Sequence, residues 1–299
     1  MTILATNVAL RTALPDTLAA MRQELDDRLA FVLPEPADER DLVCLAMRES
    51  TLAPGKRIRP LLLMMAAREL GYDKPDLVEL ACAVEMVHSA SLILDDMPCM
   101  DNAALRRGRP TIHRHFGEDI AVLASVALLS QAFRVVASLS GVPPTTRNRL
   151  VASLAGVVGT QGLVRGQYRD LREGSAERRA EDILDTNELK TGVLFGTALE
   201  MAGLVSGASD MTRQSLRNFA LELGQAFQLY DDLQDTCESQ KTGKDSGKDM
   251  GKSTLLALLG REEVIRRLRG HVEAADTELT RIYGANGLIS LYLNEMFGR

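Results

Sequence analysis

The sequence predicts an all-α protein. Strong helix formers such as Ala, Leu, Glu, Arg and Met are abundant, whereas aromatic residues make up only 4% of the 299 residues and Trp is absent. No run of alternating apolar and polar residues stands beside a hairpin turn. Short Gly- and Pro-containing segments punctuate the chain, but no linker divides it, so we predict a single domain over residues 1–299.

Each helix is predicted from helical periodicity between two breaking segments. The predicted helices cover residues 14–33, 39–52, 57–71, 76–97, 118–139, 145–172, 180–205, 212–235, 253–259, 262–283 and 286–297. The breaking segments are Pro34 with Pro36, then residues 53–55, 71–75, 108–110, 141–144, 174–175 and 203–209. In the helix over 212–235, Phe219, Leu223 and Phe227 recur at helical spacing and predict a core-facing stripe.

Composition bounds the class of partner. The net charge of −6 argues against nucleic acid as the main partner. The cysteines Cys44, Cys82, Cys99 and Cys237 lie far apart and indicate reduced thiols rather than a disulfide framework or a zinc site. We find no signal-peptide pattern and no continuous apolar run long enough for a membrane span, and therefore expect a cytoplasmic protein.

Two aspartate clusters dominate the sequence, Asp95-Asp96-Met97-Pro98-Cys99-Met100-Asp101 and Asp231-Asp232-Leu233-Gln234-Asp235, and each closes a long apolar run. Like charges one helical turn apart cost about 0.2–0.5 kcal/mol per pair on a surface helix. Charges taken out of water cost more, unless they are paired or bind a metal. We therefore predict a cavity in which carboxylates hold divalent cations. Mg²⁺ fits best, because carboxylates and substrate phosphates are its usual ligands.

The two clusters differ in spacing. Gln228, Asp231 and Asp235 follow at i, i+3 and i+7, which places them on one stripe of a helix. An N-cap for a following helix is the competing interpretation, and the Gly-rich segment after Asp235 disfavours it. In the first cluster Pro98 distorts the helix, so we expect Asp101 to reach the metals through a bulge.

Two basic runs complete the pattern. Gly55-Lys56-Arg57-Ile58-Arg59-Pro60 stands at a predicted helix start, where backbone N–H groups also favour anions. Leu105-Arg106-Arg107-Gly108-Arg109 follows the first aspartate cluster, and Arg forks match phosphate oxygens. Singly, each run is more often a solvated face. Together they carry enough positive charge for one diphosphate bound through Mg²⁺ and another bound by Lys and Arg. His88 is either a diphosphate contact or a core histidine.

Residues 238–253, ESQKTGKDSGKDMGKS, are polar and rich in Gly and Lys, and they directly follow the second aspartate cluster. The plain interpretation of such a segment is a solvated loop. Because it adjoins a predicted metal and anion site, we favour a lid that carries Lys244 and Lys252.

The sequence resembles the trans-prenyl diphosphate synthases, the enzymes of isoprenoid chain elongation. The likeness runs from about residue 25 to the C-terminus. The motifs that carry it, in order, are GKRIRP at 55–60, DDMPCMD at 95–101 with LRRGRPTIH after it, GQYRDL at 166–171, Lys190-Thr191, GQAFQLYDDLQD at 224–235 and GKD…GKST at 243–254. The two extra residues in the first aspartate motif resemble those of bacterial, carotenoid-pathway geranylgeranyl diphosphate synthases.

The resemblance implies helices around a deep central cavity, a homodimer, and Mg²⁺-dependent condensation of isopentenyl diphosphate with an allylic diphosphate (Mn²⁺ can substitute). It implies metal ligands at Asp95, Asp101, Asp231 and Asp235, with Asp96 and Asp232 as further ligands or supports of ligands. It places the allylic diphosphate on Arg106, Lys190, Thr191, Gln228, Lys244 and Lys252. It places isopentenyl diphosphate on Lys56, Arg59, His88 and Arg107. Gln167 and Asp170 would support the site.

Product length is predicted from the residues before Asp95. Ala90 and Ser91 lie about 6–8 Å before it along the helix axis, where side chains can form a floor under the growing tail. Farnesyl-type relatives usually place an aromatic residue at Ala90, so alanine favours a C20 product, geranylgeranyl diphosphate. The plain interpretation is that Ala90 is a small core residue at a helix crossing.

Three alternatives stand beside this prediction. A farnesyl diphosphate synthase would give a C15 product. A class I terpene cyclase shares the first motif but normally has an Asn/Asp, Ser/Thr, Glu triad at the second and lacks GKRIRP. A non-catalytic synthase subunit usually loses an aspartate motif, and both are intact here. One departure from many relatives is Ala103-Ala104, where acidic residues are common, and we expect it to change local charge while activity is retained.

Overall fold

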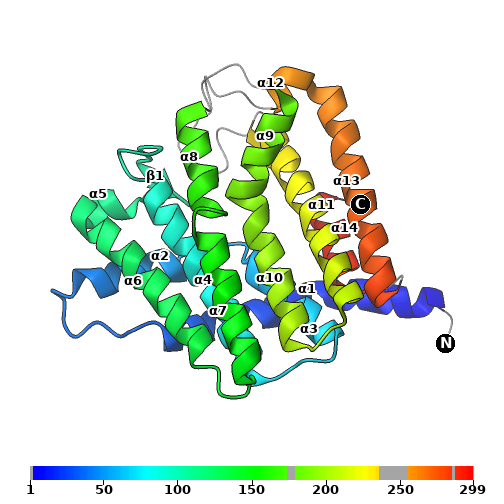
Figure 1. Cartoon of the computed structure of the whole chain (residues 1–299), viewed down its shortest axis with the longest axis horizontal. Helices are drawn as coiled ribbons and strands as arrows, with labels where there is room; N and C mark the ends of the chain where they lie inside the picture. The colour runs from blue at the N-terminus through cyan, green and yellow to red at the C-terminus, as the bar shows by residue number, and fades with distance from the viewer. Residues whose placement is uncertain (1–2, 174–178, 236–254, 285–286, 299) are drawn as a thin grey trace.

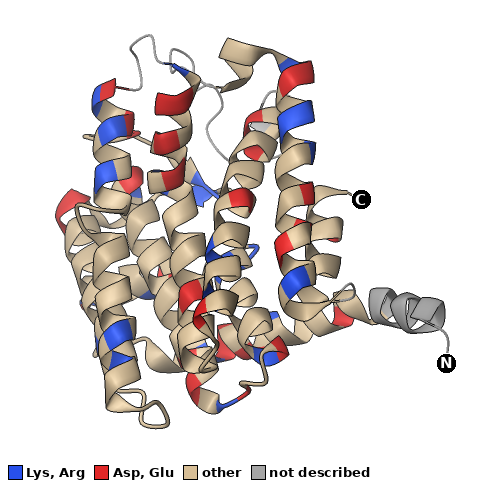
Figure 2. Cartoon of the chain, turned by 45° about the vertical axis from the view of Figure 1, so that its right-hand side comes forward, with Lys and Arg blue, Asp and Glu red and all other residues tan. Residues whose placement is uncertain are grey.

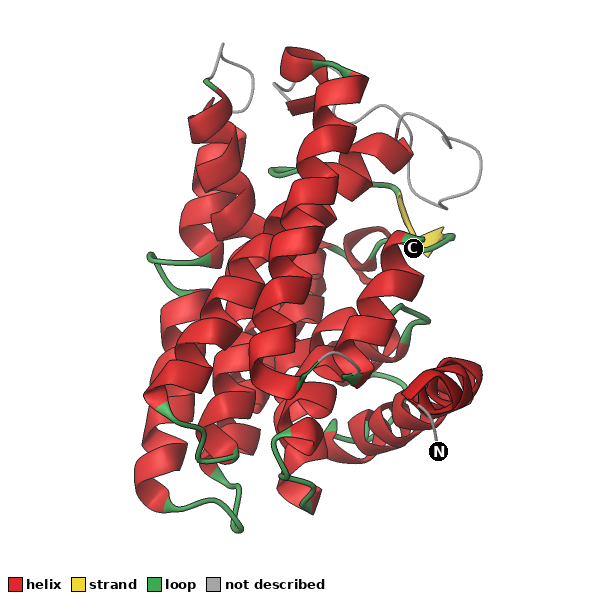
Figure 3. Ribbon diagram, turned by 90° about the vertical axis from the view of Figure 1, so that its right-hand side faces the viewer, coloured by secondary structure: helices red, strands yellow, loops and turns green. Residues whose placement is uncertain are grey.

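The structure is a computed structural model that describes residues 3–173, 179–235, 255–284 and 287–298. It confirms the all-α prediction (Figures 1 and 3). The first half comprises α1 (Ile3–Val32), α2 (Leu42–Leu52), α3 (Ile58–Glu69), α4 (Pro75–Asp95), β1 (Leu105–Arg106), β2 (Arg109–Pro110), α5 (Ile112–Phe116) and α6 (Glu118–Ala137). The second half comprises α7 (Pro144–Val158), α8 (Leu163–Glu173), α9 (Ala180–Asn187), the π-helical turn η1 (Glu188–Gly192), α10 (Val193–Val205), α11 (Asp210–Asp235), α12 (Leu255–Leu259), α13 (Arg261–Tyr283) and α14 (Leu288–Phe297).

The core is built on helices that are apolar nearly all round. Residues 61–67 of α3 are all fully buried, and most residues of α4, which lies in the middle of the molecule, are buried (Figure 1). The predicted stripe of α11 is confirmed, since Phe219 and Leu223 are fully buried and Phe227 packs against the core. One hydrophobic cluster joins residues from α1 through α14. A core shared by these helices is what a single domain would have. That residues 1–299 form one domain stays a prediction.

A short hairpin between α4 and α5 was not predicted. Leu105 pairs with Pro110 and Arg106 with Arg109, and the turn is made by Arg107 and Gly108, both with positive φ. Two consecutive positive φ values are the mark of the tight turns that suit a hairpin. The prediction of no hairpin is therefore wrong here, because strands of two residues are too short to leave an alternating pattern.

Two predicted helices are interrupted. The helix expected over 145–172 ends as α7 at Val158 and resumes as α8 at Leu163. Gly162 permits this break, because a Cβ there would overlap the Val157 carbonyl. The helix expected over 180–205 contains η1, a π-helical turn, between α9 and α10. Such turns are frequent at functional sites.

Two helices in the described part of the chain, α4 and α6, are long and apolar enough to cross a membrane by length and composition alone. In α4, 72% of the apolar window is buried, as in the core helix of a soluble protein, whereas in α6 only 44% is buried. The absence of a membrane span and the cytoplasmic location stay predictions. Cys44, Cys82 and Cys99 are free thiols, as predicted, and Cys237 lies outside the described residues.

Candidate active site

The first aspartate cluster folds back on the end of α4. The helix ends at Asp95, and the chain then turns so that the backbone N–H of Asp101 donates to the Asp95 carbonyl at 2.9 Å. Asn102 closes the turn with a φ of 48°, and its N–H donates to the Met97 carbonyl. Because the loop returns to the helix end, Asp101 lies beside Asp95 despite the intervening Pro98. The predicted bulge is confirmed.

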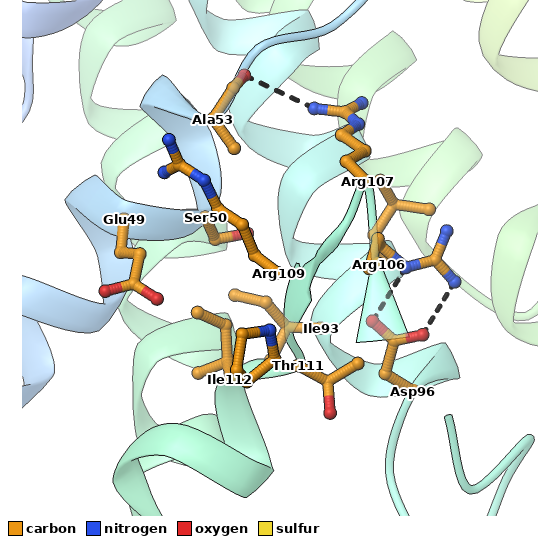
Figure 4. A pocket seen from close by; sticks show the side chains of 12 residues that line it. Glu49, Ser50, Ala53, Ile93, Asp96, Arg106, Arg107, Arg109, Thr111 and Ile112 are labelled. Carbon is orange, nitrogen blue, oxygen red and sulfur yellow. Dashed lines mark hydrogen bonds and ion pairs between the residues drawn. The ribbon is translucent and has the colours of Figure 1, made fainter. Parts of the chain in front are cut away.

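Asp96, the second residue of the cluster, binds an arginine. Its carboxylate accepts two hydrogen bonds from Arg106, 2.7 Å from Nε and 2.6 Å from Nη2 (Figure 4). The Asp96 side chain is only 5% exposed, so the pair is a buried, bidentate contact that fixes the hairpin against α4. Arg106 Nη1 has no hydrogen-bond partner among the described residues and is available to an anion. Asp96 holds Arg106 in this structure, and its part in binding a metal stays a prediction.

The Asp95 carboxylate stands in an environment that disfavours its charge. Burial above all, and then the neighbouring Asp101 and Asp96 carboxylates, raise its pKa, whereas Lys190 and Arg106 lower it; the net result is a pKa of about 6. A cation bound beside such a carboxylate would stabilise its ionised form. The acidic motif therefore carries unbalanced negative charge at the end of α4.

The second aspartate cluster lies in the last turns of α11. Gln228 Nε2 donates to Asp232 at 2.9 Å, and Asp231 interacts electrostatically with Arg59. The sequence placed Gln228 with Asp231 on one stripe, but the amide contacts Asp232 one turn on, at i+4. Asp235 is the last residue of the helix, and its side chain lies outside the described residues.

The π-helical turn η1 carries Lys190 and Thr191. Lys190 Nζ donates to Asp170 of α8 at 2.7 Å, and the Thr191 hydroxyl donates to Gln228 of α11 at 3.4 Å. Asp170, which the resemblance places in support of the site, thus contacts Lys190 directly. Through these two contacts η1 ties α8 to α11.

Two glycines let other helices approach η1. A Cβ at Gly166 of α8 would lie 2.5 Å from the Lys190 backbone nitrogen. A Cβ at Gly224 of α11 would lie 2.9 Å from the Cα of Gly192. Contacts this short leave no room for a side chain, so the position of Lys190 depends on glycine on the facing helix. GQYRDL and GQAFQLYDD both begin with these glycines, and the sequence alone gave no packing reason for them.

Several arginines act on His88, two turns before Asp95 on α4. The Arg59 guanidinium stacks 4.5 Å from the centre of the Phe195 ring, and burial lowers its pKa to about 10. Burial and then Arg59, Arg107 and nearby arginines lower the pKa of His88 well below its usual range. Arg59 Nε is buried without a hydrogen-bond partner among the described residues. The arginines around His88 concentrate positive charge, and Arg59 Nε is an N–H donor without an acceptor in the described part of the chain. Such a group of residues fits an anionic ligand.

Arg107 and Lys56 stand at the rim of this group of residues. Arg107 Nη1 donates to the Ala53 carbonyl at 3.4 Å, above a small cavity that Arg106, Arg109 and Asp96 also line (Figure 4). Lys56 is exposed. Lys244 and Lys252 of the predicted lid lie outside the described residues. Both basic and acidic residues lie on the helices at the upper end of the molecule in Figure 2.

An apolar cavity of about 340 Å³ opens beside the first aspartate cluster. Asp95, Gln167 and Lys190 stand among its lining residues with Met100, and Gln167 Oε1 is buried without a partner among the described residues. The apolar lining comes from four helices and comprises Val87, Leu94, Leu129, Val158, Leu163, Val164, Tyr168 and Leu171. The α8 residues at 164, 168 and 171 follow helical spacing, a stripe that the sequence shows but that we did not assign.

Ser91 lines this cavity, as predicted, but Ala90 does not. Ala90 is fully buried at the edge of the lining stripe, and its carbonyl accepts a hydrogen bond from Ser125 of α6 at 3.0 Å. Val87, one turn before Ser91, is also among the lining residues, and a role of Ala90 in product length stays a prediction.

The acidic residues fit a divalent metal by the chemistry of their donors. Within the described residues no three side chains of His, Cys, Asp or Glu are grouped tightly enough to hold a metal ion as they stand. The donors are nevertheless all oxygen atoms, Asp101 has been brought to Asp95, and the charge of Asp95 is unbalanced. These are the ligands and the electrostatics that Mg²⁺ requires.

Acidic helix ends, a cation cluster and an apolar cavity together define an enzyme of the isoprenoid-synthase class, which handles a hydrocarbon with a charged end. The polyprenyl synthetase family model matches residues 41–283, and the chain belongs to this family. It is 51% identical to the geranylgeranyl diphosphate synthase of Pseudescherichia vulneris, over 94% of this chain and 91% of that protein. It is 54% identical to that of Pantoea ananas, over 89% and 87%.

A solved structure agrees in fold. The geranyltransferase from Helicobacter pylori, complexed with magnesium and isoprenyl diphosphate, superposes with a TM-score of 0.83 at 27% sequence identity. The superposition covers 95% of this chain and 96% of that one.

Proposed function

We propose that this protein is a geranylgeranyl diphosphate synthase. It adds isopentenyl diphosphate head-to-tail to dimethylallyl, geranyl or farnesyl diphosphate and releases diphosphate. The observation that carries the proposal is the apolar cavity whose lining includes both Asp95 and Lys190, so that one pocket offers a wall for a prenyl tail and charges for its diphosphate. The C20 synthases among the relatives support the product, and feeding of carotenoid biosynthesis is part of the same proposal.

Asp95, Asp101, Asp231 and Asp235 would hold Mg²⁺, or Mn²⁺ in its place. When bound, the metal neutralises the charge that develops on the departing diphosphate. A relative solved with magnesium and isoprenyl diphosphate supports this assignment.

The protein's own residues bind and orient the two substrates. Lys190 and Arg106 Nη1 face the allylic diphosphate, and Arg59, Arg107 and Lys56 bind isopentenyl diphosphate. The allylic C–O bond breaks with its electron pair leaving on diphosphate, and the apolar wall keeps water from the allylic cation. The double bond of isopentenyl diphosphate then forms the new C–C bond. A proton is lost to the released diphosphate, so no side-chain nucleophile is required.

The proposal is tested by separating the products chromatographically. Purified enzyme with Mg²⁺ and isopentenyl diphosphate is incubated with dimethylallyl, geranyl or farnesyl diphosphate in turn. We expect C20 geranylgeranyl diphosphate from all three primers. A C15 end product would favour the farnesyl synthase, cyclic hydrocarbons without use of isopentenyl diphosphate would favour a terpene cyclase, and no turnover would favour a non-catalytic subunit.

Ser91→Tyr is expected to shorten the main product from C20 to C15. Ser91 lines the cavity about 6 Å before Asp95 along the helix, so a phenol ring there fills the space that the last isoprene unit needs. Product chromatography with thermal unfolding as a control measures both effects. Ala90→Tyr is the neighbouring comparison, and we expect it to lower the melting temperature because a fully buried alanine has no room for a ring. A folded Ser91→Tyr enzyme that still makes mainly C20 would contradict the cavity assignment.

We further propose that the enzyme is a homodimer joined through α6. Val122, Leu123 and Val126 stand 41%, 53% and 60% exposed on this otherwise apolar helix. The same helix contributes Leu129 to the cavity wall. A second copy of the chain would cover the exposed apolar face and would close the cavity from that side.

Leu123→Glu combined with Val126→Glu is expected to give a monomer with little activity, because two charges would be buried in the interface. Light scattering after size exclusion measures the mass. Met211→Glu is the matched control, since Met211 is 84% exposed on α11, away from this face. A double variant that remains dimeric would show that the interface lies elsewhere. A wild type that is monomeric at micromolar concentration would show that there is no stable dimer.

A further inference from the structure

Arg57, inside the GKRIRP motif, is fully engaged by the protein. Its Nε donates to Asp26 at 3.0 Å, its Nη1 to Glu85 at 2.6 Å and its Nη2 to the Ala53 carbonyl at 3.1 Å. The side chain is 2% exposed. Burial by itself would lower the pKa of Arg57, but Glu85 and Asp26 outweigh it and raise the pKa. No nitrogen of this guanidinium is left for a substrate, although the motif lies at the diphosphate site.

The backbone of Arg57 is held in an unfavourable conformation. Its φ is 52°, and among the described residues the other non-glycine residues with positive φ are Asn102 and Arg107, both in the loops of the active site. A non-glycine residue keeps such a conformation only where its surroundings over-determine it. For Arg57 those surroundings are the three acceptors just described, and Glu85 is the one partner that is itself buried.

Glu85 and Ala53 connect Arg57 to the cations of the site. Glu85 lies on α4 one turn before His88, and its charge acts on Arg59 and Arg107. The Ala53 carbonyl accepts from Arg107 as well as from Arg57. A Cβ at Gly55 would lie 2.8 Å from the Arg107 guanidinium, so the turn over 53–57 and Arg107 fit closely.

We propose that the buried Arg57–Glu85 ion pair is a positioning device for isopentenyl diphosphate. It fixes the turn over 53–57 against α4 and thereby sets where Lys56, Arg59 and Arg107 meet that diphosphate. Neither residue touches a substrate. The inference rests on the proposed function of the site.

The test replaces both charges together, as Arg57→Met with Glu85→Leu. The double change leaves the net charge unaltered, and exchange of a buried ion pair for apolar side chains of similar volume is tolerated where loss of one partner is not. We expect the KM for isopentenyl diphosphate to rise roughly 10- to 100-fold, as for an ångström-scale misplacement of binding groups. The KM for farnesyl diphosphate should stay within about twofold, because its groups lie on η1 and the hairpin.

Arg68→Met is the matched control. Arg68 lies at the other end of α3 and likewise binds two carboxylates, Asp73 and Glu24, both at 2.8 Å. We expect both KM values to be unchanged in this variant. If the double variant fails to fold, Arg57→Lys decides, since it keeps the charge opposite Glu85 but cannot make all three contacts, and the KM for isopentenyl diphosphate should again rise selectively.

The outcomes separate the two proposals. A wild-type enzyme that consumes no isopentenyl diphosphate removes the proposed function. If the wild type is active, a folded variant with both KM values unchanged and only a lower melting temperature or kcat would overturn the positioning role and leave a structural one. Equal rises in both KM values would also overturn it, because the effect would not be specific to one diphosphate.

Discussion

Asp95→Asn lowers turnover by at least about three orders of magnitude while the helical fold survives: this is the largest effect that we expect, because the variant loses a charged metal ligand. Asparagine has the same shape but can supply only a neutral oxygen. Burial has already raised the pKa of Asp95 to about 6. The pKa of Asp95 is thus higher in the folded than in the unfolded protein. At any pH above the unfolded pKa, neutral pH included, the ionised Asp95 therefore lowers the free energy of unfolding. Removal of the charge should therefore leave the melting temperature of the metal-free protein unchanged or higher.

Asp96→Asn is the adjacent control and should behave differently. Asp96 is buried and accepts both hydrogen bonds from Arg106, so its neutralisation leaves the guanidinium without its counter-charge and lowers the melting temperature. Steady-state rates with titrated Mg²⁺ and thermal unfolding without metal measure the contrast. Near-normal turnover of Asp95→Asn, or a loss of stability as large as that of Asp96→Asn, would remove Asp95 from the metal site.

Gly166→Ala is expected to have the second largest effect, a loss of activity of roughly 100-fold with about 1–3 kcal/mol of stability. The added methyl group would stand 2.5 Å from the Lys190 backbone nitrogen, and the obstacle is backbone that cannot rotate away. Either α8 or η1 has to move, and Lys190 moves away from Asp170. The rate with saturating substrates and the unfolding free energy in urea measure the two consequences.

Gly156→Ala is the control for this change. Gly156 lies in α7, and a Cβ there would meet nothing within 4 Å. Alanine in a helix interior should stabilise the protein by about 0.5–1 kcal/mol and leave the rate unaltered. If Gly166→Ala were as active as Gly156→Ala, close approach of α8 would not be what places Lys190.

The sequence predicts most helices because their apolar runs are long and their breakers are strong. It misses two interruptions, although Gly156, Gly159 and Gly162 weaken the helix near the first of them. The break at Gly162 comes with a close approach to the Val157 carbonyl five residues earlier, and the π-helical turn at Glu188–Gly192 comes with a close approach of the helix that carries Gly224. Local periodicity holds no record of such contacts.

Prediction of the site succeeded where chemistry is carried by motif and spacing. The bulge that brings Asp101 back to Asp95 follows from Pro98, and the resemblance implied that Asp170 supports the site, although not that its partner is Lys190. The division of labour between Asp95 and Asp96 could not be predicted, because it depends on the unpredicted hairpin that delivers Arg106. Which of the residues before Asp95 line the cavity could not be predicted either, because it depends on how α6 packs against α4, where Ser125 binds the Ala90 carbonyl.

The central claim is that the ends of α4 and α11 jointly hold divalent cations with a diphosphate. Anomalous diffraction tests it most directly, on crystals grown with Mn²⁺ and a non-hydrolysable allylic diphosphate analogue. We expect Mn²⁺ peaks at bonding distance from Asp95, Asp101 and Asp231, with the analogue's tail in the cavity lined by Ser91 and Val87. Peaks on surface carboxylates alone, or a bound analogue without metal at either helix end, would contradict the claim.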